Sequence, residues 1–267
     1  MTEITKTTRP SSKSGSKNSG HLIAVASGKG GVGKTWFSIS LSHALALVGK
    51  KVLLFDGDLG LANIDVQLGL MAKRDINDVI EGNLSLEHVI EHHQDGGFDV
   101  IAGRSGHGSL SAMPMQRLND LLLQIRSLVP KYDAVVVDLG AGIDRTVRFI
   151  AAAADTTIVV TTDEPTAMTD AYAFIKLSHA AGHGDNIKFV INMATDIKEG
   201  EGTYRTLQKA CKKFLNITPP LIGVIRQDKR VKEAIRAQTP FLTRSPNSET
   251  AEDVEKIAKH VTEEILA

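Results

Sequence analysis

The sequence lacks several features that would place it in a class at once. It has one cysteine, Cys211, in 267 residues, which excludes an internal disulfide and any metal or cluster site built from paired cysteines of one chain. This cysteine usage suits a reducing compartment. Basic and acidic residues balance at 31 each. No overall field therefore draws the molecule onto nucleic acid or anionic lipid, and such binding would need a local patch.

Long apolar runs are also missing. No stretch of about 18 apolar residues exists to span a bilayer, and residues 1–20 contain no apolar core of a secretory signal. These first residues are rich in Ser, Thr and Lys, so we predict a disordered basic tail over 1–20, with a partner-binding arm as the alternative. We expect one domain over 21–267 in a cytoplasmic protein.

After residue 20, short apolar runs alternate with helical stretches. The runs are rich in Val, Ile and Leu, which is typical of strands covered on both faces. Right-handed crossovers then favour a doubly wound α/β domain, with a mostly parallel sheet of about seven strands and helices on both faces. The predicted strands are 22–27, 52–55, 98–102, 134–138, 156–161, 187–191 and 221–225.

The last stretch, 249–266, carries an apolar stripe at helical spacing, with Val254, Ile257 and Val261 on it. Such a stripe could face the sheet or a membrane surface. Interfacial helices usually add aromatic residues and a row of basic ones, and this stretch has no aromatics and mixed charges. We therefore predict that the stripe packs on the core.

A glycine-rich segment, GKGGVGKT, directly follows the first predicted strand and fits GxxxxGK[ST]. Its backbone N–H groups can point at phosphate oxygens, Lys34 can reach the β- and γ-phosphates, and the Thr35 hydroxyl can bind Mg²⁺. The alternative is a glycine turn that binds nothing. We predict a site for ATP and Mg²⁺, with Trp36 as a fluorescence reporter, built from Gly28, Lys29, Gly30, Gly31, Val32, Gly33, Lys34, Thr35 and Trp36.

Three aspartates follow predicted strands, where parallel sheets gather ligand groups. Asp56 and Asp58 lie in DGDLGLAN, and Asp138 lies in AVVVDLGAG. We predict that Asp138, a Walker-B-like acid, binds the metal together with Thr35 and Asp56. For Asp58, the alternative to a site role is a helix N-cap with a neighbouring loop acid.

The loop holds a second lysine, Lys29, whose charge beside Lys34 calls for a further anion. The motif KGGVGKT resembles the signature of the MinD/ParA family of deviant-Walker P-loop ATPases. The resemblance implies that Lys29 reaches across a dimer to the partner's ATP and that Asp58 orients the attacking water, so we predict that both are catalytic.

Two further positions follow from the same resemblance. Asn192, at the end of an apolar strand, matches the asparagine that reads the adenine edge, with a capping role as the alternative. Asp228 lies where the family closes the base pocket. There, Arg226 replaces the family's usual proline.

Four segments, DGDLGLANIDVQLGL, NDVIEG, EPTAMTDAYAFIK and TPFLTRSPNS, are similar to the FlhG/FleN branch, regulators of flagellar number and placement. This implies a homodimer in the ATP state, a flagellar transcription activator or basal-body component as protein partner, and recruitment to the cell pole as an option. The branch's DQAxxLR segment is absent from residues 1–20, so we do not expect stimulation of a GTPase. No amphipathic membrane helix follows Ile265, so we do not expect stable lipid binding.

Two alternatives remain open. A MinD-like division-site ATPase would need that membrane helix. A ParA-like partition ATPase would bind DNA through a basic surface, although Asp228 and Glu233 interrupt the available set, which favours a solvated face. That set comprises Arg205, Lys209, Lys212, Lys213, Lys229, Arg230, Lys232 and Arg236.

Three histidines, His88, His92 and His93, could suggest a metal site because helical spacing brings positions 88 and 92 together. They have no placed acid or cysteine partner, and we predict solvated histidines on a polar helix.

Overall fold

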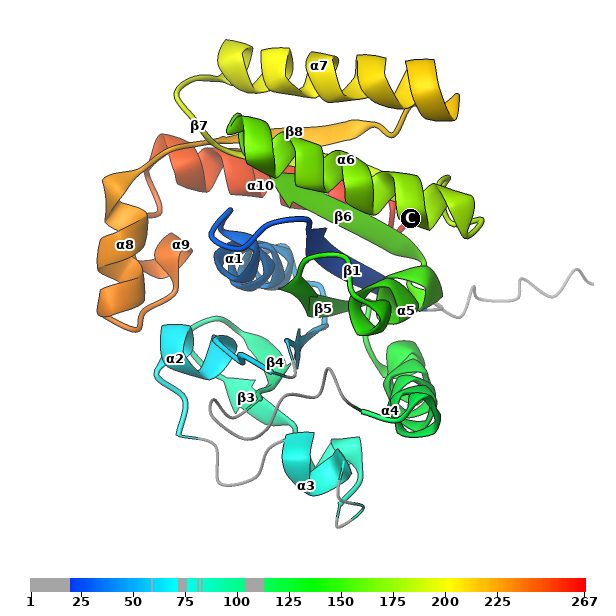
Figure 1. The fold of residues 1–267 in the computed structure, drawn as a ribbon. Helices are drawn as coiled ribbons and strands as arrows, with labels where there is room; N and C mark the ends of the chain where they lie inside the picture. The colour runs from blue at the N-terminus through cyan, green and yellow to red at the C-terminus, as the bar shows by residue number, and fades with distance from the viewer. Residues whose placement is uncertain (1–19, 59, 72–75, 81, 83, 104–112) are drawn as a thin grey trace, which may run out of the picture.

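The sheet brings the residues of the candidate site together at the carboxyl ends of its parallel strands. The structure, a computed structural model, describes residues 20–58, 60–71, 76–80, 82, 84–103 and 113–267. Almost all of the predicted tail, residues 1–19, lies outside these residues. Eight strands form one sheet in the order β3-β4-β2-β5-β1-β6-β7-β8, and all neighbours are parallel except β3 and β4 (Figure 1).

The strand bounds follow the predicted apolar runs closely. Each parallel strand reads as a buried Val/Ile/Leu run, as expected for strands between two helix layers. The strands are β1 His21–Ser27, β2 Val52–Gly57, β3 Glu91–His93, β4 Phe98–Ile101, β5 Ala134–Ala141, β6 Thr156–Thr161, β7 Ile187–Ala194 and β8 Leu221–Arg226. The prediction of a doubly wound, mostly parallel sheet is confirmed.

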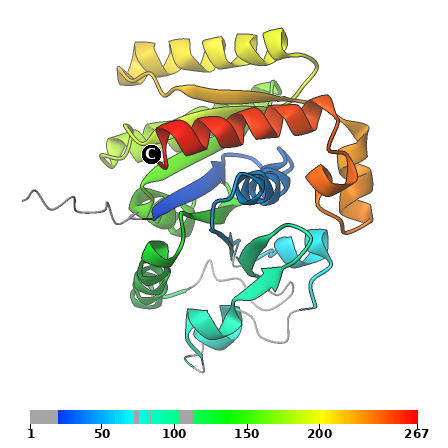
Figure 2. The same cartoon turned by 180° about the vertical axis from the view of Figure 1, so that it is seen from behind.

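Helices cover both faces of the sheet (Figures 1 and 2). One face packs against α4 Met115–Leu128, α5 Arg145–Ala153, α6 Pro165–Ala180 and α7 Ile197–Leu215. The other packs against α1 Lys34–Leu47, α2 Ile64–Leu68, α8 Lys229–Arg236, α9 Phe241–Arg244 and α10 Glu249–Glu264. A short helix, α3 Ile76–Ile80, and two 3-10 turns, Leu86–Val89 and Val129–Lys131, complete the described elements.

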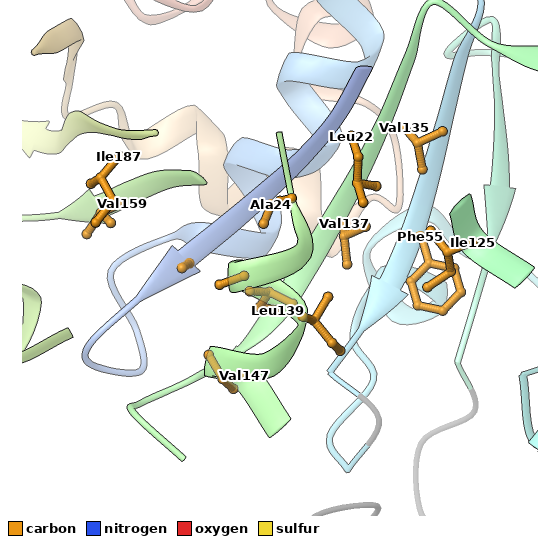
Figure 3. Packing of buried hydrophobic residues seen from close by; sticks show 14 of the residues in the cluster. Leu22, Ala24, Phe55, Ile125, Val135, Val137, Leu139, Val147, Val159 and Ile187 are labelled. Carbon is orange, nitrogen blue, oxygen red and sulfur yellow. The ribbon is translucent and has the colours of Figure 1, made fainter. Parts of the chain in front are cut away.

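The core consists of two apolar layers, one on each side of the sheet. Figure 3 shows the first, where Leu22, Val135 and Val137 of neighbouring strands meet Phe55 and Ile125. Period-2 alternation sends the intervening residues, such as Ile23 and Val136, into the second layer. The layers fix the register of β1 against β5, and with it the loops at the strand ends.

The final helix, α10, confirms the predicted core packing of the apolar stripe. Val254, Ile257 and Val261 are fully buried, and Ile257 lies against Gly223 of β8. The helix starts at Ser248, whose hydroxyl accepts a hydrogen bond from the Ala251 N–H. Val261 and its neighbours therefore belong to the core, and among the described residues no helix is long and apolar enough to cross a membrane.

Two predictions about the region before β4 were wrong. The sheet has eight strands where we expected about seven, because the three residues of β3 carry no apolar pattern and pair antiparallel at the edge. His88, His92 and His93 share no helix. His88 lies in a 3-10 turn, His92 lies on β3 beside Asp99, and His93 is buried and stacks on Phe98.

Candidate nucleotide-binding site

The glycine loop between β1 and α1 has the backbone geometry that its sequence predicts. Gly31 and Gly33 have φ angles of +83° and +84°, which side chains with a Cβ rarely adopt. A Cβ on Gly33 would also lie 2.4 Å from the amide nitrogen of Asn192. Lys34 and Thr35 follow directly at the N-terminus of α1, where free N–H groups and the helix dipole favour an anion.

Asp138, near the end of β5, is the centre of a hydrogen-bonded cluster at the start of α1. Its carboxylate accepts hydrogen bonds from Lys34 Nζ at 3.0 Å, Thr35 Oγ1 at 2.7 Å and Ser38 Oγ at 2.8 Å. Asp138 and Lys34 are both buried, so the pair is shielded from solvent. The loop lysine, the predicted metal threonine and the predicted Walker-B acid therefore lie in direct contact.

Asp56 lies on the neighbouring strand, opposite Asp138 in the β2–β5 register. It is buried and accepts hydrogen bonds from the backbone N–H groups of Asp58, Asn63 and Ile64. Burial, and then the charge of Asp138, raise the pKa of Asp56 to about 7. Two buried carboxylates thus lie side by side on neighbouring strands, and one ammonium, that of Lys34, is paired with Asp138.

This charge pattern fits a bound cation. Oxygen donors on Thr35, Asp56 and Asp138 are the type that Mg²⁺ prefers, and a cation there would offset the charge that raises the Asp56 pKa. The described residues hold no group of three or more His, Cys, Asp or Glu that could bind a metal ion. Mg²⁺ in nucleotide sites is usually bound by one or two protein carboxylates together with substrate phosphates, and the two carboxylates here match that pattern.

Asp58 lies at the mouth of the loop, half-buried, and lines the pocket described below. Its carboxylate accepts from the Leu61 N–H at 3.1 Å and lies near Gly140 of β5. The helix α2 begins only after Asn63, so Asp58 is not its N-cap. It borders both the glycine loop and the segment after the Walker-B acid.

A pocket of about 600 Å³ runs from the glycine loop to the ends of β7 and β8. Asn192 lies on its floor, buried, and its amide donates to the Val32 carbonyl at 2.8 Å. That contact ties β7 to the glycine loop and is not a helix cap. Asp228 lines the same pocket and is itself the N-cap of α8, accepting from the Arg230 N–H. The pocket is lined further by Ser27, Leu61, Gln67, Met193, Arg226, Gln227, Val231, Lys232, Ile235 and Thr250, among others.

Lys29 does not lie in its own loop's cradle. Its Nζ donates to Glu164 Oε1 at 2.5 Å and to Thr166 Oγ1 at 2.7 Å, at the start of α6. The ion pair is exposed, with side chains 34% and 55% accessible, and Lys29 lowers the pKa of Glu164. Lys29 therefore faces outward, on the surface where Pro165 begins α6.

Sequence reasoning missed several of these contacts. Ser38 could have been found, because a residue four places after Lys34 lies on the same face of a helix. The partners of Lys29 could not, because Glu164 and Thr166 lie at the start of α6, 135 and 137 residues along the chain, and become adjacent only in the folded protein. Gln67 and Lys232 line the pocket, and no site role was predicted for Gln67 or a nucleotide-binding role for Lys232.

Together, the strand, glycine loop and helix, the buried Lys34 and the Walker-B carboxylate define a P-loop nucleotide-binding protein. Comparison with known families is more specific. The family described as the CobQ/CobB/MinD/ParA nucleotide binding domain matches residues 23–241. The chain belongs to this family of nucleotide-binding ATPases, and within it to the FlhG/FleN branch.

Two curated relatives support the branch. The chain is 39% identical to the antiactivator FleN of Pseudomonas aeruginosa, over 92% of this chain and 88% of that protein. It is 33% identical to the flagellum site-determining protein YlxH of Helicobacter pylori, over 93% of this chain and 84% of that protein.

Solved structures agree with the fold. The septum site-determining protein MinD of Pyrococcus horikoshii, complexed with Mg-ADP, superposes with a TM-score of 0.77 at 27% identity, covering 92% of this chain and 98% of that one. A MinC:MinD complex from Aquifex aeolicus gives 0.74 at 26% identity, covering 91% and 96%.

Proposed function

We propose that this chain is an ATP-dependent dimerising switch that hydrolyses ATP and regulates flagellar number or placement. The observation that carries the proposal is the outward position of Lys29. Because Lys29 lies outside its own phosphate cradle, on an exposed surface, it could exchange its pairing with Glu164 for the nucleotide of a second subunit. The similarity to FleN and YlxH supports the flagellar role.

The roles of the residues follow from their positions. ATP carries a γ-phosphate whose negative charge must be neutralised, and a bound Mg²⁺ would supply part of that neutralisation. In this proposal Lys34 and the N–H groups of the glycine loop bind the phosphates, while Thr35, Asp56 and Asp138 hold the metal. Asp58 lies at the loop mouth, where it would orient the attacking water.

Base recognition would lie at the other end of the pocket. The amide nitrogen of Asn192 is used by Val32, which leaves its carbonyl oxygen as an acceptor for an exocyclic amino group such as that of adenine. Asp228, held by Arg230, lies beside the loop after β8 and would border the base.

Dimerisation would supply the switch. A ligand shifts an equilibrium only through a different affinity for the two states, and the γ-phosphate distinguishes ATP from ADP. In the single chain Glu164 already neutralises Lys29, so the dimer must offer this lysine a stronger anion. A cation supplied in trans contributes about 10³- to 10⁵-fold to phosphoryl transfer, which predicts slow turnover by the monomer.

The test is light scattering on a size-exclusion column in ADP and in ATP. Asp58→Ala should slow hydrolysis and preserve an ATP dimer, and Lys29→Ala in that background should abolish it. A nucleotide-independent monomer would refute the switch and leave an ordinary P-loop ATPase. ATP-dependent capture of a purified flagellar transcription activator or basal-body component would then test the role.

Partition-like DNA binding has less support. Two of the basic residues are paired with acids, Arg205 with Glu201 and Arg230 with Asp228. The helices that carry the set, α7 and α8, lie along different borders of the molecule in Figure 1. The cations therefore do not form one continuous track on a single chain.

A further inference from the structure

Arg226 is the point at which the candidate base pocket departs from its family pattern. It ends β8 and lines the pocket beside Gln227, Asp228 and Thr250. Its side chain is 18% exposed. A proline at this place would offer a small apolar wall, whereas arginine brings a charged, planar group.

The guanidinium of Arg226 is held rigidly. Its Nε donates to Asp253 Oδ2 at 2.9 Å and its Nη2 to Asp253 Oδ1 at 2.9 Å, a bidentate pair with a buried carboxylate. Nη1 lies 2.6 Å from Glu249 Oε1, and Nη2 also donates to the Glu249 carbonyl. The backbone is tied down too, because Arg226 N–H donates to Asp253 and Thr250 Oγ1 donates to the Arg226 carbonyl.

Because its N–H groups are occupied, the guanidinium of Arg226 can contact a ligand through the two flat faces of its plane. Each of its three nitrogens already meets an acceptor on α10, so the group cannot easily turn to bond a phosphate. A guanidinium packs face to face on aromatic rings, through stacking and cation–π attraction. Bidentate pairing lowers the entropy lost in this contact because the plane is fixed beforehand.

We propose that Arg226, positioned by Asp253, is a stacking platform for the base of the bound nucleotide. The inference rests on the proposed function, since it requires nucleotide in this pocket. Apolar side chains of Met193, Val231 and Ile235 border the same space. The platform favours a purine, because a two-ring base presents more π surface to the cation than a pyrimidine does.

The test separates the base from the phosphates. Binding of ATP and of inorganic tripolyphosphate, each with Mg²⁺, is measured by calorimetry and by Trp36 fluorescence. Arg226→Met should weaken ATP about threefold to tenfold and leave tripolyphosphate unchanged. Arg126→Met, which removes a more exposed arginine–aspartate pair with Asp155 away from the pocket, is the control and should change neither.

Equal weakening of both ligands, or no weakening of ATP, would overturn the inference. If Arg226→Met fails to fold, by circular dichroism, the unmodified protein still decides: it should bind ATP more tightly than CTP, which also has an exocyclic amino group for Asn192, and equal affinities refute the platform. Failure of the nucleotide site on which the inference rests looks different, because the unmodified protein then binds neither ATP nor tripolyphosphate. Failure of the dimer switch alone would appear in light scattering and leave these binding results unchanged.

Discussion

His43 makes the folded chain sensitive to mild acid. It lies on α1, 4% exposed, and its Nδ1 has no hydrogen-bond partner among the described residues. Burial, and then the charge of His93, lower its pKa from 6.5 to about 4. The folded state therefore keeps His43 neutral at pH values where the unfolded chain takes up a proton, so protonation favours unfolding.

The magnitude follows from the two pKa values. His43 does not reduce the free energy of unfolding well above pH 6.5, where it is neutral in both states. The free energy of unfolding falls as the pH drops from 6.5 towards 4. Between pH 7.5 and pH 5 the free energy of unfolding should fall by about 2 kcal/mol, and by about 3 kcal/mol in all once the pH is below both values. The pKa of His93 is also lowered by burial, which adds loss in the same direction.

The assay is urea unfolding at pH 7.5 and pH 5. Other groups titrate over this range, so the loss of unfolding free energy between pH 7.5 and pH 5 is measured for both the unmodified protein and His43→Leu. The informative quantity is the difference between these two losses. We expect this difference to be about 2 kcal/mol. The exposed His88, replaced by Leu, is the control and should match the unmodified protein. Identical pH dependence in His43→Leu and the unmodified protein would refute the reasoning.

Three further predictions concern the site and its surface. Gly33→Ala, strained at φ +84° and crowded against Asn192, should cost about 1–3 kcal/mol in urea unfolding and weaken ATP in calorimetry; unaltered affinity contradicts the cradle geometry. Glu164→Gln, which releases Lys29 from its ion pair, should raise the dimer fraction in ATP by light scattering, and a lower fraction contradicts the proposed role of that pair. DNA binding should be weak and its logarithmic salt slope shallow; a steep slope would restore the partition alternative.

The sequence predicted the parallel part of the fold because each buried strand is a continuous apolar run. The helix-spaced stripe of α10 was equally informative, since Val254 and Ile257 can be buried together only on one face. The antiparallel edge strand β3 was not predictable from pattern. Its three polar residues owe their conformation to pairing with β4, a tertiary effect that outweighs local propensity.

Part of the site could also be predicted from the sequence and part could not. Lys34, Thr35 and Asp138 were found because each belongs to a motif at the end of a predicted strand, and the structure brings them into contact. Contacts between motifs were not visible in the sequence. The pairing of Lys29 with Glu164, and of Arg226 with Asp253, depends on which strands become neighbours and where α10 returns to the sheet.

The candidate ligand groups come from the ends of β1, β2, β5, β7 and β8, which are spread over most of the width of the sheet. A nucleotide bound there would contact the ends of several strands at once. The chain itself joins these strands through long crossover connections. The binding energy of the nucleotide adds to the cost of opening these strand ends, by RT ln(1 + [L]/Kd) for free ligand. Amide hydrogen exchange and protease resistance at the carboxyl ends of these strands should therefore record how much nucleotide the protein holds.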